Sequence, residues 1–325
     1  MSQVPGTMRA IALNEFGGID KLTLKEVPVP ELAENEVLIA VEAAGVGEWD
    51  PFEREGGFAG LTGSPPAFPY IPGSEGAGTV AAVGRGVTKF KPGDEVYASG
   101  FLNPKGGFYA EYAAVDAGLV CFVPRHIAIQ DAAVMSGVGL TALRGLDDTL
   151  HLREGETLAV HGASGGVGHL AVQIAKHRGA RILAIASGED GVALAEKLGA
   201  DAVVDGHRDD VGAAVRNFAP DGLDVALLTA GGDAANDILR SLHTGGRAAY
   251  PNGVEPAPQA PSGIQLASYN GDPDPDILHR FHEQVESGPF EVQVDGTFPL
   301  AEAAEAHQAL EKHYVGKLAL RVSGT

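Results

Sequence analysis

The chain has 325 residues, of which 44% are hydrophobic and 20% charged, and its formal net charge at pH 7 is −20. This composition is typical of a globular protein long enough for two domains, and the negative charge argues against nucleic acid and anionic membranes as partners. The N-terminus lacks the apolar run of a signal peptide and the single cysteine, Cys121, excludes a disulfide framework, so we expect a cytoplasmic protein.

Short strands and turns dominate the N-terminal part of the chain. Alternating apolar residues predict strands at residues 8–13, 37–41, 109–115 and 119–123. Residues 51–72, between the second and third of these strands, are rich in glycine and proline and are expected to form a long loop. Loops of that length inside a compact domain are usually functional.

From residue 129 onward, strands alternate with helices. Apolar runs predict strands at 157–160, 180–186, 201–205, 223–228, 247–250 and 264–268, and helical spacing predicts helices at 131–135, 140–146 and 192–199. This α/β alternation predicts a doubly wound parallel sheet with 264–268 at its edge. The C-terminal residues 288–325 resemble the N-terminal part of the chain, because they again contain short strand-like segments. We therefore expect a discontinuous domain, residues 1–128 and 288–325, with a nucleotide-binding domain, residues 129–287, inserted in it.

A glycine-rich turn follows the strand at 157–160 and opens a helix. Ala163, Gly165 and Gly168 occupy the positions of a G-x-G-x-x-G fingerprint, with alanine at the first. A strand, such a turn and a helix N-terminus aim bare backbone N–H groups at one point, which suits a pyrophosphate. We predict that the cofactor is bound by Ala163, Ser164, Gly165, Gly166, Val167 and Gly168. A bulky residue at Gly165 or Gly168 is expected to block this approach and leave the secondary structure intact. The alternative is a tight turn with no ligand.

The end of the next strand bears on the choice of cofactor. NAD-specific domains place an acid there to bind the ribose 2′-hydroxyl, whereas this chain has Ala186 followed by Ser187. Without the carboxylate a 2′-phosphate meets no repulsion, and Ser187 can donate a hydrogen bond to it. Arg208 could supply positive charge, although a solvated loop residue is an equally good interpretation. The sequence favours NADP, with NAD as the alternative.

Several blocks of sequence, in this order, resemble the medium-chain dehydrogenase/reductase superfamily and, within it, the zinc-free quinone oxidoreductases. The blocks are IPGSEGAGTVAAVGRGVTKFKPGDEV, SGVGLTALRGL, GETLAVHGASGGVGHLAVQIAK, LGADAVVD, TFPLAEAAEAHQALE and GKLALRV. The resemblance implies a GroES-like catalytic domain and a Rossmann domain. It also implies that Thr141, Thr229, Ala230, Gly231, Asn252 and Gly253 line the bound nicotinamide cofactor, and that two chains pair through the edge strand as a homodimer.

The same resemblance implies that no metal is bound. Where zinc-dependent members have cysteine, histidine and cysteine ligands, this chain has Gly47, Ser74 and Ser136. A tetrahedral zinc site needs soft ligands that these residues do not supply. The quinone reductases usually read N-P-x-D where this chain has Gly47-Glu48-Trp49-Asp50, so the asparagine is missing and Asp50 remains.

These features predict a zinc-independent oxidoreductase that transfers hydride from NADPH to a quinone or an α,β-unsaturated carbonyl. Tyr269 and Asp50 are the candidate catalytic residues, although Asp50 could instead cap a turn. Lys317 is a weaker candidate, because a lysine in a terminal strand is usually solvated. The competing hypothesis is a nucleotide-binding protein with little turnover, acting as a redox sensor or a structural protein, and the altered turn at Gly47 is its best support.

Overall fold

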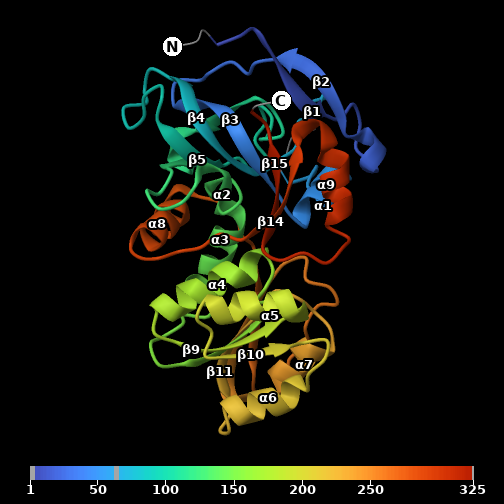
Figure 1. Ribbon diagram of the computed structural model, residues 1–325, viewed down its shortest axis with the longest axis vertical. Helices are drawn as coiled ribbons and strands as arrows, with labels where there is room; N and C mark the ends of the chain where they lie inside the picture. The colour runs from blue at the N-terminus through green and yellow to red at the C-terminus, as the bar shows by residue number, and fades with distance from the viewer. Residues whose placement is uncertain (1–3, 62–65, 324–325) are drawn as a thin grey trace. The chain divides into compact units, whose positions relative to one another are not determined.

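The computed structural model describes residues 4–61 and 66–323 (Figure 1). They form two compact units, Met1–Gly137 together with Pro273–Thr325, and Val138–Asp272. The units divide after residue 137 and after residue 272, whereas the sequence placed the boundaries at 128 and 288. Helices α2 (Ile129–Ala132) and α8 (Pro275–Glu286) belong to the first unit, because α2 packs on its sheet and α8 packs on strand β7.

Within the described ranges, the first unit is built on a seven-stranded sheet ordered β14-β15-β3-β4-β5-β7, with β6 also paired to β3. A separate two-stranded sheet pairs β1 with β2. The strands are β1 (Thr7–Ala12), β2 (Thr23–Pro28), β3 (Glu36–Val46), β4 (Glu75–Val83), β5 (Glu95–Ser99), β6 (Tyr112–Asp116), β7 (Val120–Phe122), β14 (Val294–Pro299) and β15 (Lys317–Arg321). Alternate residues such as Ile39, Val41 and Leu318 point into one hydrophobic core, as a half-buried antiparallel sheet requires.

Short helices complete the first unit. They are α1 (Trp49–Arg54), α2, α8, α9 (Ala303–Ala309) and the 3-10 turns η1 (Ile19–Lys21), η2 (Ala117–Leu119) and η4 (Leu300–Glu302). Helix α1 occupies residues 51–54 of the expected loop 51–72, so this part of the prediction is wrong, and residues 62–65 of that loop lie outside the described residues. The helix α1 is important for the site because it carries Trp49 and Asp50.

The second unit, all of whose residues are described, is a six-stranded parallel sheet ordered β10-β9-β8-β11-β12-β13. The strands are β8 (Thr157–His161), β9 (Arg181–Ala186), β10 (Ala202–Asp205), β11 (Leu223–Leu228), β12 (Leu242–Pro251) and β13 (Gln265–Tyr269). The order reverses between β8 and β11, and this is the doubly wound topology that the sequence predicted. Strand β13 lies at the sheet edge, also as predicted.

Helices cover both faces of this sheet. Figure 1 shows α4 and α5 on one face and α6 and α7 on the other. The helices of the unit are α3 (Ser136–Leu143, which begins in the first unit), the π-helical η3 (Arg144–Thr149), α4 (Gly166–His177), α5 (Gly188–Lys197), α6 (Val211–Phe218) and α7 (Asp233–Arg240). Because both faces are covered, strands such as β8 are buried over most of their length and read as apolar runs.

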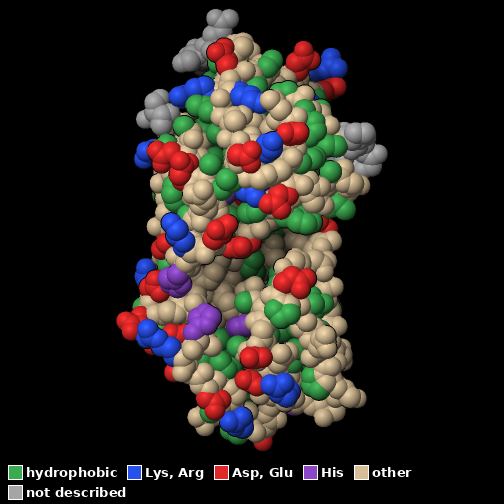
Figure 2. Space-filling view, turned by 90° about the vertical axis from the view of Figure 1, so that its right-hand side faces the viewer, with side chains coloured by type: hydrophobic (Ala, Val, Ile, Leu, Met, Phe, Trp, Pro, Cys, Tyr) green, Lys and Arg blue, Asp and Glu red, His purple; other side chains and the backbone are tan. Residues whose placement is uncertain are grey.

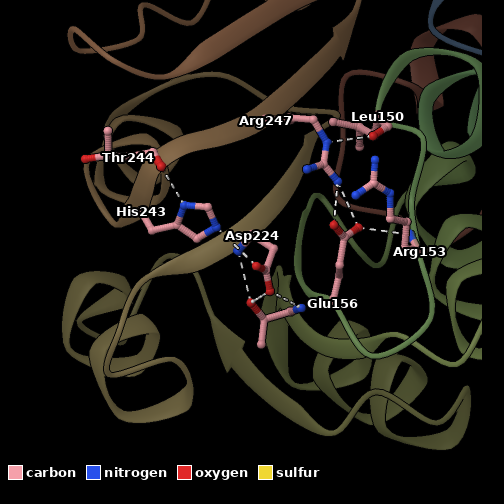
Figure 3. A network of polar contacts seen from close by, with 8 residues as sticks. Leu150, Arg153, Glu156, Asp224, His243, Thr244 and Arg247 are labelled. Carbon is pink, nitrogen blue, oxygen red and sulfur yellow. Dashed lines mark hydrogen bonds and ion pairs between the residues drawn. The ribbon is translucent and has the colours of Figure 1, made fainter.

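A polar network ties together the amino ends of β8, β11 and β12 (Figure 3). The Asp224 carboxylate accepts hydrogen bonds from the Thr157 N–H at 2.8 Å and hydroxyl at 2.7 Å, and His243 Nε2 lies 3.1 Å from its other oxygen. Burial opposes ionisation, but these hydrogen bonds outweigh it and lower the pKa of Asp224. Arg247 Nη2 contacts both Glu156 oxygens at 2.8 Å. These contacts link the three strands near their amino ends.

The surface carries charges of both signs. Figure 2 shows Asp and Glu side chains distributed over the visible face of both units, with Lys and Arg between them. None of the helices in the described ranges is long and apolar enough to span a membrane.

Candidate functional site

In the turn after β8, a side chain would find open space at Gly165, whereas Gly162 and Gly168 must be glycine for the turn to form. Gly162 has φ +77°, and a Cβ at Gly168 would lie 2.0 Å from the Gly162 carbonyl oxygen. Both positions therefore require glycine whatever is bound. The expectation that a bulky residue at Gly168 leaves the secondary structure intact is wrong. Gly165 has φ −83°, and its Cβ would meet only the Gly162 carbonyl oxygen at 3.4 Å, so its bare backbone faces open space.

Helix α4 starts directly after this turn, at Gly166. The N–H groups of its first turn have no carbonyl partner within the helix, and the helix dipole adds partial positive charge. The Ser164 hydroxyl accepts a hydrogen bond from the Ser187 N–H at 3.2 Å, which ties the turn to the end of β9. The segment 163–168 thus offers the bare donors and the space that a pyrophosphate needs, and a dinucleotide fits it.

The end of β9 carries no acid. Ala186 is buried and pairs in register with Asp205 of β10, and the Arg208 guanidinium lies 3.6 Å from the Asp205 carboxylate. Arg208 also donates to Glu189 at 2.9 Å, and this hydrogen bond raises the pKa of the already cationic guanidinium. Both partners are exposed, and exposed ion pairs contribute little to stability, so the pair with Glu189 does not fix Arg208 in place.

Two further predicted turns lie at the same carboxyl edge of the sheet. The Thr229 hydroxyl donates to the His161 carbonyl at 2.7 Å, so the turn after β11 is fixed against the end of β8. Asn252 follows β12, its N–H donates to the Tyr269 carbonyl at 2.8 Å, and its amide donates to Asn270 at 2.6 Å. The structure therefore brings the segments 163–168, 186–187, 229–231 and 252–253 together at one edge of one sheet.

Thr141 and Tyr269 contact this region from α3 and β13. A Cβ at Gly271 would lie 2.1 Å from the Thr141 hydroxyl, so that hydroxyl lies against the chain just after β13. The Tyr269 hydroxyl is buried, has no hydrogen-bond partner among the described residues, and packs against the backbone of Gly145. Burial raises the pKa of Tyr269, which keeps it a neutral phenol.

Asp50 lies in the first unit and is completely buried. One carboxylate oxygen accepts the Gly47 N–H at 2.6 Å, the turn contact that was the alternative to a catalytic role, while the other has no hydrogen-bond partner among the described residues. Burial and the neighbouring carboxylates of Glu53 and Glu75 raise the pKa of Asp50 to about 8, against the opposing charge of Lys317. Asp50 is therefore partly protonated near neutral pH.

Lys317 is buried, contrary to the expectation of a solvated lysine. Only 2% of its side chain is exposed, its Nζ lies 3.0 Å from the Glu75 carboxylate, and it lies over the Trp49 ring at 4.3 Å from the centroid. Glu75 is equally buried and also accepts the Gly137 N–H at 2.7 Å and the Ser136 hydroxyl at 3.2 Å. The first unit thus contains an ion pair away from water, stacked on an indole.

Comparison with known proteins assigns both halves of the chain. Residues 33–125 match the family model described as alcohol dehydrogenase GroES-like domain, and residues 166–261 match the one described as zinc-binding dehydrogenase. An NADPH-dependent alkenal/one oxidoreductase of Arabidopsis thaliana is 33% identical over 98% of this chain and 80% of its own length. The quinone oxidoreductase of Rattus norvegicus is 32% identical over 96% of each chain.

The chain belongs to the quinone oxidoreductase-like family of the medium-chain dehydrogenase/reductases. A mycobacterial protein solved in complex with NADPH has a TM-score of 0.80 and 30% identity over 97% of this chain and all of its own. The GroES-like unit and the Rossmann unit that the sequence predicted are both confirmed.

The three positions of the zinc ligands in metal-dependent members of the superfamily do not fit zinc here. Gly47 has no side chain, Ser136 donates to Glu75 and to a backbone carbonyl, and Ser74 accepts the Trp49 indole N–H at 2.6 Å. Hydroxyls engaged in this way are poor zinc ligands. No group of three or more His, Cys, Asp or Glu in the described ranges could hold a metal ion.

Sequence reasoning identified Asp50 but missed Glu53, Glu75 and the burial of Lys317. One signal was available for Glu75, which stands in the run GSEGAGTV among small and apolar residues, where a charge is expected only if it is paired. The partner comes from a strand more than two hundred positions later, and no local pattern connects the two.

Proposed function

We propose that this protein is an NADPH-dependent reductase of quinones or α,β-unsaturated carbonyls that works without zinc. The observation that carries the proposal is the combination of an open phosphate cradle at Gly165 with serine and glycine at the three metal positions. The names of the relatives, an NADPH-dependent alkenal/one oxidoreductase and a quinone oxidoreductase, support the same reaction class.

The cofactor preference is argued from one strand end. Ala186 presents no carboxylate to repel a 2′-phosphate, Ser187 follows it directly, and Arg208 is near on the neighbouring strand's turn. A 2′-phosphate therefore gains attraction where NAD would lack its usual acidic partner. The mycobacterial neighbour solved with NADPH supports this assignment, with NAD as the weaker alternative.

Conjugated acceptors suit a site with no Lewis acid. A simple alcohol or ketone relies on strong polarisation of its oxygen, which a metal supplies. In a quinone or an enone, the charge left by hydride addition spreads over the conjugated system. Orientation of the two reactants and hydrogen bonds to the acceptor oxygen therefore lower the barrier more effectively than they do for a simple ketone. The bound nicotinamide supplies the hydride when present.

The chain's own residues bind and orient the two partners. The segment 163–168 holds the pyrophosphate, and the turns at 229–231 and 252–253 place the nicotinamide end. The reduced acceptor needs one proton for each hydride, and solvent, the Tyr269 phenol and Asp50 are the candidate sources. Tyr269 and Asp50 are both protonated to a useful degree near neutral pH, through burial in each case.

The test is turnover with NADPH and NADH side by side, on a panel of quinones, enones and simple ketones, using protein of measured metal content. We expect NADPH oxidation with at least one quinone or enone, and none with the simple ketones. Tight NADPH binding without turnover on any acceptor would favour the competing function of a redox sensor or structural protein, for which the altered Gly47-Glu48-Trp49 turn is the supporting feature.

A further inference from the structure

Each of the three positions at which metal-dependent members carry zinc ligands contacts one member of the same buried trio, Lys317, Trp49 and Glu75. A Cβ at Gly47 would lie 2.7 Å from Lys317 Nζ. The Ser74 hydroxyl accepts the Trp49 N–H at 2.6 Å, and the Ser136 hydroxyl donates to Glu75 at 3.2 Å. The ammonium thus lies in the space that a ligand side chain at position 47 would enter.

Glycine at position 47 is required by this arrangement. Any side chain there would meet the ammonium at 2.7 Å and the Trp49 ring at 2.9 Å. Gly45 is similarly required, because its Cβ would lie 2.5 Å from the Glu75 carboxylate oxygen that pairs with Lys317. The chain therefore carries no side chain at positions 45 and 47, at the end of β3, where the ion pair packs against its backbone.

The charge of Lys317 matters because the surrounding acids outnumber the cations. Asp50, Glu53 and Glu75 are all buried in this unit, and Lys317 is the cation that acts on Asp50. An ion pair taken out of water must be well held, because removing one partner leaves an uncompensated charge. The Lys317 ammonium is stabilised by its ion pair with Glu75 and by a cation–π contact with the Trp49 ring.

We propose that Lys317 is a positioning residue that holds Trp49 and Glu75 with its ammonium and supplies the positive charge that controls the proton on Asp50. Both groups contact Gly47, because its N–H donates to Asp50 at 2.6 Å and its Cβ would lie 2.7 Å from the Lys317 ammonium. The charged and titratable groups that face Asp50 are Glu53 from α1, Glu75 from β4, Lys317 from β15, and the hydroxyls of Tyr70, Tyr109 and Tyr314.

The single tryptophan of the chain makes the proposal testable without substrate or cofactor. Trp49 is the only tryptophan, and it contacts Lys317 directly. We would titrate its fluorescence from pH 5 to 10 in the cofactor-free protein. The variants are Lys317→Met, Glu75→Gln, the double variant and Asp50→Asn. The tyrosines keep their protons through this range, and burial raises the pKa of Glu53 as well as that of Asp50. The wild type should show a transition near pH 8 that is assigned to Asp50 by its loss in Asp50→Asn.

The two single variants should shift that transition in opposite directions. Lys317→Met removes an attractive charge and should raise the midpoint by about one unit or more, whereas Glu75→Gln removes a repulsive charge and should lower it. The double variant, which keeps the packing and removes both charges, should return close to the wild-type midpoint. It also covers the case in which Lys317→Met alone does not fold.

A purely structural role would give a different result. If Lys317→Met has the wild-type midpoint, or if the double variant has the same midpoint as Glu75→Gln, or if Asp50→Asn keeps the transition, Lys317 does not control Asp50 and the proposal fails. The measurement involves no acceptor or cofactor. Its outcome is therefore independent of whether the proposed reductase activity is found.

Discussion

Replacing Gly165 by valine should remove cofactor binding without removing the fold. The position has φ −83° and extended ψ, which valine adopts readily, and the nearest atom to its Cβ is a carbonyl oxygen at 3.4 Å. The added side chain would occupy the open space beside Gly165, the residue that precedes the first turn of α4. We therefore expect near-wild-type thermal stability and weak NADPH binding.

The size of the effect follows from the bonds that the side chain obstructs. A hydrogen bond to a charged group contributes about 1.5–3 kcal/mol, and each ~1.4 kcal/mol is tenfold in affinity. Loss of one such bond to the pyrophosphate should weaken NADPH binding by about ten- to a hundredfold, and loss of two by more. Gly165→Ala, with a smaller side chain, should lie between the wild type and valine.

Calorimetric titration of NADPH, with circular dichroism on the same samples, measures both properties. Gly168→Ala is the contrasting control, because its Cβ would lie 2.0 Å from the Gly162 carbonyl oxygen, so it should lower the melting temperature. A folded Gly165→Val protein with unchanged NADPH affinity would show that the pyrophosphate is not bound at this turn.

Four further predictions follow from other sites. Wild-type protein should prefer NADPH over NADH by about ten- to a hundredfold in kcat/KM, and Ala186→Asp should reverse this preference by placing a carboxylate against the 2′-phosphate. A wild-type ratio of kcat/KM for NADPH to that for NADH below one, unchanged in Ala186→Asp, would contradict the placement of the strand end. Tyr269→Phe should lower kcat at least several-fold with little change in NADPH affinity if the phenol supplies the proton, and equal kcat would assign the proton to Asp50 or solvent. The exposed edge of β13 should pair two chains, so sedimentation at micromolar concentration should give a homodimer, and a clean monomer would refute this. The His243 ring donates hydrogen bonds to the Thr244 carbonyl and the Asp224 carboxylate, which raises its pKa, so its stabilising contribution is present below its ordinary pKa, about 6.5, and is lost as the pH rises through the raised value. The melting-temperature difference between wild type and His243→Gln should shrink over that window, and a constant difference would contradict it.

The Rossmann unit could be predicted because its signals are local. The strand at 157–160, the glycine turn and the helix after it are adjacent in sequence, and the apolar runs of β9 to β11 reflect burial on both faces. The fingerprint residues therefore came together as expected. What local reasoning could not give was the difference between Gly165 and Gly168, which depends on how closely α4 approaches the turn.

The buried charge cluster and the domain boundaries could not be predicted, because they depend on contacts between residues far apart in the sequence. Lys317 looks like a surface lysine in its own strand, and only the pairing of β15 with β3, and of β3 with β4, brings it to Glu75. The helices α2 and α8 have ordinary helical sequences, and only their contacts with the first unit assign them to it. Both features depend on residues far apart in the chain.

The central claim is that this chain reduces a conjugated acceptor with NADPH and without zinc. The most direct measurement is NADPH oxidation with a quinone and an enone by protein whose metal content has been determined, before and after treatment with a strong chelator. The account predicts turnover that is unchanged by the chelator in protein with far less than one zinc per chain. Stoichiometric zinc, with activity that disappears on chelation and returns with added metal, would contradict it.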